Sequence, residues 1–418
     1  MKNFFKKLRL KRRLITVLAG LHFYGNPSSK VKIVGVTGTS GKTTTATLLY
    51  RIATILGYKA GLIGTVENLI NGQKVDFSKD RAVPGTTPDP ITLHKLLNKM
   101  VEEGCDYVFM EVSSHAMDQD RVAGIKFTGG IFTNLSQDHF DYHKNFENYF
   151  QAKKKFFKIL PAGAFALSNT DDERGVAMLV DIKAKGQSYG FSGGENFHGE
   201  IKANDFSGLS LSFNNVELHS HLLGKFNAYN LLAVWSACNL LSFDMVRVNK
   251  ILENIEPPRG RFEHFTTPDG VLVIVDYAHK PDALEKIFTA VKETKKTSGK
   301  LISVFGCGGD RDPLKRPIMG KIGAAMSDIA IFTSDNPRSE DPDKIIEMMK
   351  TDLSPELLAK VKTIPNRHKA ILESLRLAQK GDIILCAGKG HEDYQEINGV
   401  KHHFDDMEEY RKATAEIK

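Results

Sequence analysis

The sequence predicts an α/β protein of two main domains, each built around a mostly parallel sheet. From residue 31 onward, short apolar runs alternate with helical stretches, which is the pattern of parallel α/β architecture. Residues 256–260 (EPPRG) interrupt this alternation and favour a linker. A chain of 418 residues is long enough for more than one domain. We therefore expect a central domain over residues 31–257 and a C-terminal domain over residues 258–418, after an N-terminal tail of residues 1–30.

The composition is that of an ordinary globular protein. Apolar residues make up 41% and charged residues 26%, which excludes disorder, collagen and a coiled coil as descriptions of the whole chain. Four widely spaced cysteines, without a CxxC pair, argue against a disulfide framework or a zinc ribbon. These observations favour a protein of the reducing cytoplasm.

The positive charge is concentrated in the N-terminal tail. Residues 1–13 contain seven Lys and Arg and no acid, which equals the net charge of +7. Because the basicity is local, we expect no nucleic-acid partner. The eleven mostly apolar residues 14–24 are too short for a membrane span, which needs about 20 residues. We interpret the tail as a helix packed on the body, with two alternatives: peripheral membrane contact through residues 1–25 at the inner face of the membrane, and a signal peptide.

The central domain is predicted from three apolar runs that are expected to be strands of one sheet. They are residues 31–36 (VKIVGV), 107–112 (YVFMEV) and 130–133 (GIFT). Helices are expected over residues 42–56 and 227–241. Residues 186–222 are rich in Gly, Ser and Asn and contain alternating apolar patches, which predicts an antiparallel insertion or edge.

The C-terminal domain is predicted to be a Rossmann-like α/β domain, because four apolar strands are each followed at once by a polar cluster. The strands are residues 271–275, 301–305, 329–333 and 383–386, and the clusters are DYAHKPD, GCGGDRD, SDNPR and AGKGHED. Ligands of open parallel sheets bind beyond the carboxyl ends of the strands. Four clusters at four such ends therefore indicate one shared ligand site.

Residues 37–45 (TGTSGKTTT) lie between a predicted strand and a predicted helix and are similar to a phosphate-binding loop. The strict pattern needs glycine at position 36, where this sequence has Val36. The physical requirements are still met, because glycines let backbone N–H groups approach a phosphate and the helix N-terminus favours anions. Lys42 adds a positive charge, and Thr43 can bind Mg²⁺. The central domain is therefore predicted to be a P-loop ATPase domain that uses ATP and Mg²⁺.

Two residues near strand ends are candidate ligands of a hard cation. Glu111 ends the YVFMEV run, and His139 lies in NLSQDHFD, which follows another predicted strand. Carboxylate and other oxygen ligands suit Mg²⁺, and imidazole can join them. Two structural alternatives stay open: Glu111 as a buried carboxylate paired with Lys42, and His139 as a hydrogen-bonded structural histidine.

Together these motifs resemble the Mur ligase family of peptidoglycan synthesis over roughly residues 31–418. The resemblance rests on VTGTSGKTTT, TTPDP, MEVSSHAMDQDRV, NLSQDHFDYH, AKKKFF, GKFNAYN, RGRFE, VDYAHKPDAL, GCGGDRDPLKRP, SDNPR and AGKGHEDYQ. It implies ATP-dependent amide-bond formation through an acyl phosphate, which adds the third amino acid of the stem peptide to a UDP-linked muramoyl dipeptide. The family usually carries a further N-terminal domain that binds the uridine nucleotide. Because 36 residues precede Thr37, this sequence is expected to lack that domain.

The resemblance also implies roles for individual residues. Those expected to bind ATP are Gly38, Thr39, Ser40, Gly41, Lys42, Thr43, Thr44, Asn227, Asn230, Arg261 and Asp276. Those expected to hold the metal are Thr43, Glu111, His139 and, if it is carbamylated, Lys153. The expected catalytic set is Lys42, Glu111, His139 and Lys153. From its spacing alone, Lys153 in a KKK run would instead be a solvated surface lysine.

Two substrate pockets follow from the same resemblance. The residues expected to bind the muramoyl substrate are Thr86, Thr87, Ser113, Gln119 and Arg121. Those expected to bind the incoming amino acid are Arg311, Asp335, Asn336, Arg338, Gly388 and Glu392. The DNPR form indicates meso-diaminopimelate, since Arg338 can bind its distant carboxylate through two hydrogen bonds. L-Lysine and ornithine stay open as substrates, and a structural ion pair stays open for Arg338.

Two other functions are compatible with the loop and the fold. One is a Mur-like or folylpolyglutamate-type ligase that acts on a different carboxylate substrate, against which the TTPDP and DNPR motifs argue. The other is a nucleotide-binding regulatory or scaffold protein without turnover, against which the complete set of expected catalytic residues argues. We expect small-molecule substrates and a monomeric protein.

Overall fold

The computed structural model describes residues 23–76, 86–295 and 299–416, which form two compact units. Unit 1 contains the described residues up to Ile255 except Asp205–Ser207, and unit 2 contains those three residues and the chain from Glu256 onward. The interpretations of the basic tail fall largely on residues 1–22, which lie outside the described residues. In the part of the chain that is described, no helix combines the length and the apolar character needed to cross a bilayer.

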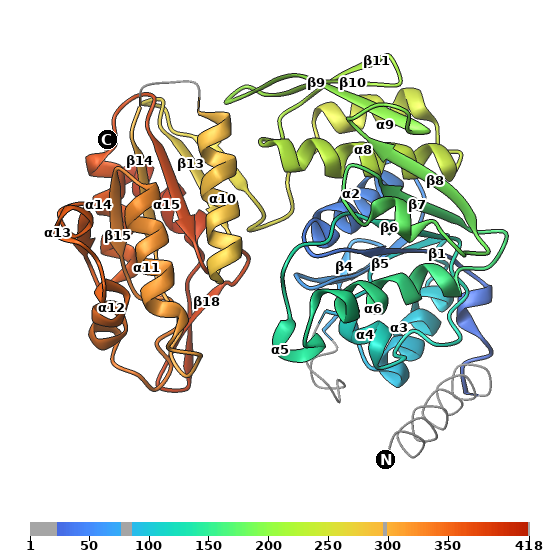
Figure 1. Cartoon of the computed structure of the whole chain (residues 1–418), viewed down its shortest axis with the longest axis horizontal. Helices are drawn as coiled ribbons and strands as arrows, with labels where there is room; N and C mark the ends of the chain where they lie inside the picture. Colours follow the sequence, from blue (N-terminus) through green and yellow to red (C-terminus); the bar gives the residue numbers. More distant parts are fainter. Residues whose placement is uncertain (1–22, 77–85, 296–298, 417–418) are drawn as a thin grey trace. The chain divides into compact units, whose positions relative to one another are not determined.

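Unit 1 is built on an eleven-stranded sheet, counted over the described residues, whose centre is parallel (Figure 1). The strand order is β11-β10-β9-β8-β7-β6-β1-β5-β2-β3-β4. The strands are β1 (Lys32–Thr37), β2 (Ala60–Ile63), β3 (Asn68–Ile70), β4 (Gln73–Lys74), β5 (Tyr107–Glu111), β6 (Gly129–Phe132), β7 (Phe165–Asn169), β8 (Lys185–Gly190), β9 (Phe197–Asp205), β10 (Gly208–Phe213) and β11 (Val216–Ser220). Parallel pairing runs from β2 through β5, β1, β6, β7 and β8 to β9.

The three strands expected from the apolar runs are confirmed as β1, β5 and β6. The antiparallel edge expected within residues 186–222 is confirmed for β10 and β11. It is wrong for β8 and β9, which pair in parallel through two residue pairs, Tyr189 with Phe197 and Gly190 with His198. A hairpin turn joins only antiparallel strands, so the segment between β8 and β9 is not a hairpin.

Helices cover both faces of this sheet and enclose two apolar cores (Figure 1). The helices are η1 (Pro27–Ser29), α2 (Lys42–Ile55), α3 (Pro90–Glu102), α4 (Ser114–Asp118), α5 (Phe140–His143), α6 (Phe146–Ile159), α7 (Gly175–Met178), α8 (Lys225–Leu240) and α9 (Met245–Glu253). Helices α2, α8 and α9 contribute to one core, and α3, α4 and α6 contribute to the other. Because side chains alternate along a strand, Val34 of β1 lies in the first core and Ile33 in the second.

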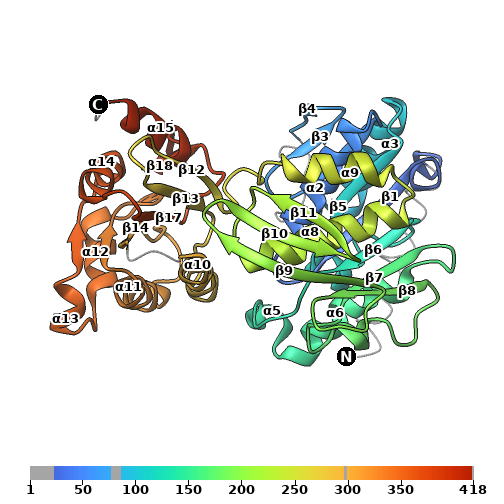
Figure 2. The same cartoon turned by 90° about the horizontal axis from the view of Figure 1, so that it is seen from above.

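Unit 2 is a Rossmann-like layered unit with a six-stranded sheet in the order β12-β13-β17-β14-β15-β16 (Figure 2). The strands are β12 (Glu263–Thr266), β13 (Leu272–Asp276), β14 (Leu301–Phe305), β15 (Ile329–Phe332), β16 (Val361–Thr363) and β17 (Ile383–Ala387), with a separate hairpin of β18 (Tyr394–Ile397) and β19 (Val400–His403). Only the β12 pairing in this sheet is antiparallel among the described residues. The four strands expected in the second half of the chain are confirmed as β13, β14, β15 and β17, and their carboxyl ends lie at one edge.

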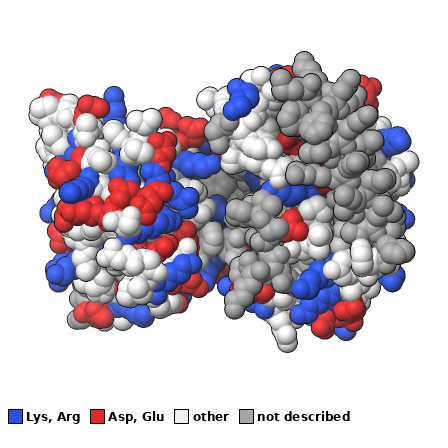
Figure 3. Space-filling view, turned by 90° about the horizontal axis from the view of Figure 1, so that it is seen from below, with Lys and Arg blue, Asp and Glu red and all other residues white. Residues whose placement is uncertain are grey.

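Helices pack on both faces of the second sheet, with α14 and α15 on one face and α10 and α11 on the other (Figure 2). The helices are α10 (Pro281–Thr294), α11 (Lys315–Met326), α12 (Pro342–Lys350), α13 (Pro355–Leu358), α14 (Arg367–Leu377) and α15 (Asp406–Glu416). A fully buried ion pair joins α14 to α15, since Arg367 Nε and Nη2 each donate to Asp406 at 2.7 Å. On the face shown in Figure 3, unit 2 presents Lys and Arg side by side with Asp and Glu.

Candidate active site

The phosphate-binding loop connects β1 to α2, and two of its glycines lie where no side chain would fit. Gly41 has a φ of +83°, and a Cβ there would lie 2.5 Å from Asn230 Oδ1. Gly38 has a φ of +153°, and a Cβ there would lie 1.9 Å from Thr133 Oγ1. Because these positions carry no side chain, the loop can wrap an anion closely with its backbone N–H groups.

The loop is held by its own lysine and by the segment that follows β6. Lys42 Nζ donates to the carbonyl oxygens of Gly38 at 2.9 Å and Thr39 at 2.7 Å. The backbone N–H of Ser40 donates to Asn134 Oδ1 at 3.0 Å. A phosphate carries a negative charge that these two carbonyl groups lack, so it would accept stronger hydrogen bonds from Lys42.

Glu111, at the end of β5, is buried beside the loop and is held by three donors. Thr43 Oγ1 donates to Oε1 at 3.0 Å, the Thr65 N–H donates to Oε1 at 2.7 Å, and Thr65 Oγ1 donates to Oε2 at 3.1 Å. The carboxylate is therefore fixed next to Thr43, as a shared metal site would need. Sequence reasoning missed Thr65, which follows β2 and carries no motif of its own.

Lys153, on α6, is buried with 1% of its surface exposed, so the interpretation of a solvated lysine is wrong. The run of three lysines lies on an amphipathic helix whose inner face carries this side chain against the loop. Its Nζ donates to Gly38 O at 2.6 Å and lies 4.5 Å from the centre of the Tyr149 ring. Burial, and then the charge of Lys42, lower the pKa of Lys153 well below its ordinary value.

Of the nine expected catalytic and muramoyl-binding residues of unit 1, six line a cavity of about 240 Å³, whereas Glu111, Thr87 and Gln119 are not among its lining residues. It is lined by Lys42, Thr86, Ser113, Ser114, His115, Arg121, His139, Tyr149 and Lys153. Three of these, Ser114, His115 and Tyr149, were not predicted as site residues. The rings of His115 and His139 pack edge to face with their centres 4.8 Å apart. Residues far apart in the sequence, on α2, α4 and α6, thus meet at one opening.

Four of the expected muramoyl-binding residues form a hydrogen-bonded network between the segment before α3 and the segments that follow β5 and α4. Thr87 Oγ1 donates to Glu111 O at 2.9 Å and accepts from the Ser113 N–H at 3.0 Å. Arg121 Nη1 donates to Thr87 O at 2.7 Å, and its Nε and Nη2 donate to Gln119 Oε1. The structure therefore brings these side chains together next to Glu111.

Asn227 and Asn230 lie in the first turns of α8, and Asn230 packs against Gly41 of the loop. Asn230 Nδ2 donates to Asn227 Oδ1 at 3.1 Å, and Asn227 Nδ2 donates to Leu223 O at 2.8 Å. Both side chains are buried. This placement beside the phosphate-binding loop suits the expected nucleotide contact.

In unit 2, four of the six residues expected to bind the amino acid meet beyond β15 and β17. A Cβ on Gly388 would lie 2.7 Å from Asp335 Oδ2, and Asn336 Nδ2 donates to Glu392 Oε2 at 2.8 Å. Burial, followed by the charge of Asp335, raises the pKa of Glu392. Two neighbouring carboxylates in a buried setting favour a ligand with ammonium groups.

Lys389 is fully buried under this cluster and was not predicted as a site residue. Its Nζ donates to Asn336 Oδ1 at 3.2 Å and lies 3.4 Å from Glu392 Oε2. The residue lies within the AGKGHEDYQ motif, but only the contact seen in the structure assigns it to the pocket. Its charge balances one of the two carboxylates.

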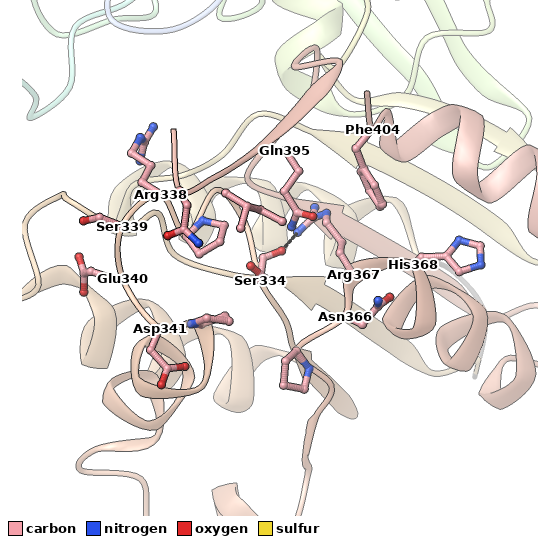
Figure 4. A pocket seen from close by; sticks show the side chains of 15 residues that line it. Ser334, Arg338, Ser339, Glu340, Asp341, Asn366, Arg367, His368, Gln395 and Phe404 are labelled. Carbon is pink, nitrogen blue, oxygen red and sulfur yellow. Dashed lines mark hydrogen bonds between the residues drawn. The ribbon is translucent and has the colours of Figure 1, made fainter. Parts of the chain in front are cut away.

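The remaining two, Arg311 and Arg338, flank Gly308 in the loop after β14. A Cβ on Gly308 would lie 3.1 Å from Arg338 Nη1 and 3.5 Å from Arg311 Cγ. Arg338 also lines a cavity of about 630 Å³ between the loops that follow β15 and β16, where Ser334, Asn366, Arg367 and His368 are neighbours (Figure 4). The ion pair left open for Arg338 is present, with Glu396 as its partner.

Arg261 and Asp276, the other two residues expected at the nucleotide, also belong to unit 2. Asp276 ends β13 and accepts from the N–H groups of Phe262 at 2.9 Å and Ala278 at 2.8 Å. Burial raises its pKa, and the charge of Arg261 opposes that shift. Arg261 stacks over the ring of Tyr277 at 4.9 Å, and its buried Nε has no hydrogen-bond partner in the described structure.

The residues expected to hold Mg²⁺ suit an ion that is shared with a nucleotide. Within the described ranges, no three His, Cys, Asp or Glu side chains gather into a metal site. Mg²⁺ in nucleotide sites takes one or two protein ligands and completes its shell with phosphate oxygens and water. The paired Thr43 and Glu111 fit that role. Lys153 would fit only as a carbamate, because an amine lacks the carboxylate oxygens that Mg²⁺ prefers.

A phosphate-binding loop on a parallel sheet, with a fixed carboxylate and a buried lysine beside it, defines a nucleotide-dependent α/β enzyme. Residues 36–238 match the Mur ligase middle domain, and residues 260–390 match the Mur ligase glutamate ligase domain. The chain belongs to the Mur ligase family of ATP-dependent amide ligases.

Relatives within the family are similar over most of the chain. The UDP-N-acetylmuramoyl-L-alanyl-D-glutamate–2,6-diaminopimelate ligase of Bacteroides thetaiotaomicron is 52% identical over 92% of this chain and 79% of its own. The ligase of the same name from Clostridium botulinum is 40% identical over 98% of this chain and 83% of its own. A solved structure of a ligase of that name has 31% identity and a TM-score of 0.70, covering 96% of this chain and 83% of its own. Folylpolyglutamate synthase from Thermotoga maritima shares the fold, with a TM-score of 0.68, 15% identity and 90% of each chain covered.

Proposed function

We propose that this chain adds meso-diaminopimelate to the D-glutamate carboxylate of UDP-N-acetylmuramoyl-L-Ala-D-Glu, at the expense of ATP. The observation that carries the proposal is 52% identity, over 92% of the chain, to a ligase named for that reaction. The cluster of Asp335, Asn336, Gly388 and Glu392, with two arginines beside it, supports a pocket for an amino acid that carries both ammonium groups and a second carboxylate.

In the proposed reaction, the D-glutamate carboxylate attacks the γ-phosphate of ATP to give an acyl phosphate and ADP. The amine of the diamino acid then attacks the acyl carbon, and phosphate leaves. Phosphoryl transfer depends mainly on positioning and on charge neutralisation. Lys42 and the backbone N–H groups of the loop would supply both to the phosphates, and Arg121 and Ser113 would orient the muramoyl substrate.

Mg²⁺, when bound, would neutralise charge on the ATP phosphates. Thr43, Glu111, His139 and a carbamate on Lys153 would hold it. The burial of Lys153 supports the modification, because the neutral amine that reacts with carbon dioxide is favoured there. Arg338 would select the diamino acid through its distant carboxylate, which L-lysine and ornithine lack.

The proposal is tested by a ligation assay detected by mass spectrometry. The purified chain receives ATP, Mg²⁺, bicarbonate and UDP-N-acetylmuramoyl-L-Ala-D-Glu, with meso-diaminopimelate or L-lysine in separate reactions. We expect a tripeptide product with meso-diaminopimelate alone, and none from Lys42→Ala. If folded chain that binds ATP gives no product with either amino acid, the proposed function is wrong. The chain would then act on a different carboxylate substrate or bind nucleotide without turnover.

Three further expectations stay predictions. They are a monomeric state, a cytoplasmic location, and membrane contact through residues 1–25.

A further inference from the structure

The backbone of Arg338 is held by the β18–β19 hairpin. The Arg338 N–H donates to Glu396 O at 3.0 Å, and the Asn398 N–H donates to Arg338 O at 2.7 Å. Arg338 has a φ of +50°, a left-handed conformation that a residue with a long side chain adopts only where its surroundings hold it. The hairpin thus fixes the point from which the arginine side chain starts, on the loop seen in Figure 4.

The guanidinium group is held on two further sides. Nη1 donates to Gly309 O at 2.7 Å, and Nε lies 3.4 Å from Glu396 Oε2. The Arg338 and Glu396 side chains are 20% and 25% exposed, so the pair is partly shielded from solvent. Nη2 has no partner among the described residues. An arginine offers five N–H donors, and this arrangement leaves the outer Nη1–Nη2 edge for a carboxylate.

We propose that Glu396 is a specificity-determining residue of the amino-acid pocket. It orients the Arg338 guanidinium through Nε and offsets part of its charge, and it thereby sets how strongly the pocket favours a diamino acid with a second carboxylate. This inference rests on the proposed function, in which Arg338 binds that carboxylate.

The expected effect follows from the charges. A carboxylate that approaches Arg338 also approaches Glu396, and like charges at such short range repel one another when solvent is partly excluded. A glutamine at position 396 keeps an amide oxygen near Nε, so the guanidinium keeps a polar neighbour on that side while the negative charge is removed. Attraction for the second carboxylate then rises. The side-chain ammonium of L-lysine meets a less compensated arginine and gains nothing.

The experiment measures kcat and KM for meso-diaminopimelate, L-lysine and ATP in the full-length enzyme and in Glu396→Gln. Calorimetric titration of each amino acid into enzyme loaded with a non-hydrolysable ATP analogue and the muramoyl dipeptide gives affinity without turnover. We expect KM and Kd for meso-diaminopimelate to fall about threefold or more in the variant. KM for ATP should stay within about twofold, and L-lysine should bind no better than before. The matched control is Glu347→Gln, because Glu347 forms an exposed ion pair with Lys350 on α12 and should leave every constant unchanged.

Glu396→Ala separates orientation from charge. It removes both the charge and the oxygen near Nε, so its KM for meso-diaminopimelate should exceed that of Glu396→Gln. Thermal denaturation should show the same folded stability for both variants. An unchanged or raised dissociation constant Kd for meso-diaminopimelate in Glu396→Gln would overturn the inference, as would an equal gain in affinity for L-lysine. The proposed function fails separately, if the wild-type enzyme makes no tripeptide in the ligation assay. That assay does not involve the Glu396 variants, so the two failures are distinguishable.

Discussion

At the scale of the residue, burial changes the chemistry of Lys153. In water a lysine amine is protonated at neutral pH and does not react with carbon dioxide. With 1% of its surface exposed and the charge of Lys42 nearby, the protonated form is disfavoured and the pKa falls. The neutral amine is therefore available at a lower pH than in an exposed lysine.

We predict that Lys153 is carbamylated at neutral pH. With ¹³C-bicarbonate, the wild-type enzyme should show a carbamate signal by NMR near pH 7, and Lys153→Arg should not, because a guanidinium group stays protonated. Lys155→Arg is the control, since Lys155 lies on the same helix as Lys153 and forms an ion pair with Asp120. A carbamate signal that survives in Lys153→Arg would place the modification elsewhere.

The same pKa shift predicts how stability depends on pH. The native state holds Lys153 with a lowered pKa, so over the interval between the folded and unfolded pKa values the unfolded chain binds more protons. The contribution of this residue to the free energy of unfolding therefore rises with pH across that interval. In bicarbonate-free buffer, Lys153→Met should have a higher free energy of unfolding than wild type at neutral pH. This difference in free energy should decrease as the pH rises. Denaturant titrations measure both free energies of unfolding. A difference between Lys153→Met and wild type that is the same at every pH would contradict the lowered pKa of Lys153.

At the scale of the element, the ends of β2, β5 and α2 meet at Glu111. Thr65, just after β2, donates to both carboxylate oxygens through its N–H and its hydroxyl. We predict that Thr65→Val weakens Mg²⁺ binding about tenfold, because residues that orient a metal ligand typically contribute that much to affinity. The Mg²⁺ dissociation constant is measured by titrating Mg²⁺ into enzyme that holds a non-hydrolysable ATP analogue. Thr65→Ser, which keeps the hydroxyl, should restore the affinity for Mg²⁺. A Mg²⁺ dissociation constant of Thr65→Val equal to that of wild type would exclude a role of the Thr65 hydroxyl in orienting Glu111.

The elements differ in how far sequence could predict them. Strands such as β1 and β17 are continuous apolar runs because both faces of a parallel sheet are covered, and such runs are visible in sequence. The contact of Thr65 with Glu111 depends on the register between β2 and β5, which no local pattern encodes. The burial of Lys153 depends likewise on which face of α6 meets the phosphate-binding loop. Residues in motifs were therefore predictable, and their partners from other strands and helices were not.

At the scale of the whole molecule, the residues expected at the nucleotide come from both compact units. The loop with Lys42, Asn227 and Asn230 belongs to unit 1, whereas Arg261 and Asp276 belong to unit 2. A ligand that binds only the native state stabilises it by an amount set by its concentration relative to Kd, about 2.7 kcal/mol at one hundred times Kd. Whether a unit is stabilised thus reports whether it contributes to binding.

We predict that a non-hydrolysable ATP analogue with Mg²⁺, at one hundred times Kd, raises the unfolding temperature of both units. Scanning calorimetry, with the single tryptophan Trp235 as a fluorescent reporter of unit 1, distinguishes the two transitions. In Arg261→Ala, the unit 2 transition should lose most of its shift because the arginine that faces Asp276 and Tyr277 is gone, while unit 1 should keep its own. Lys42→Ala should reduce both shifts, since it removes the charge that is proposed to bind the phosphates. If the analogue shifts unit 1 alone in the wild-type enzyme, Arg261 and Asp276 do not contact the nucleotide, and their assignment to the ATP site is wrong.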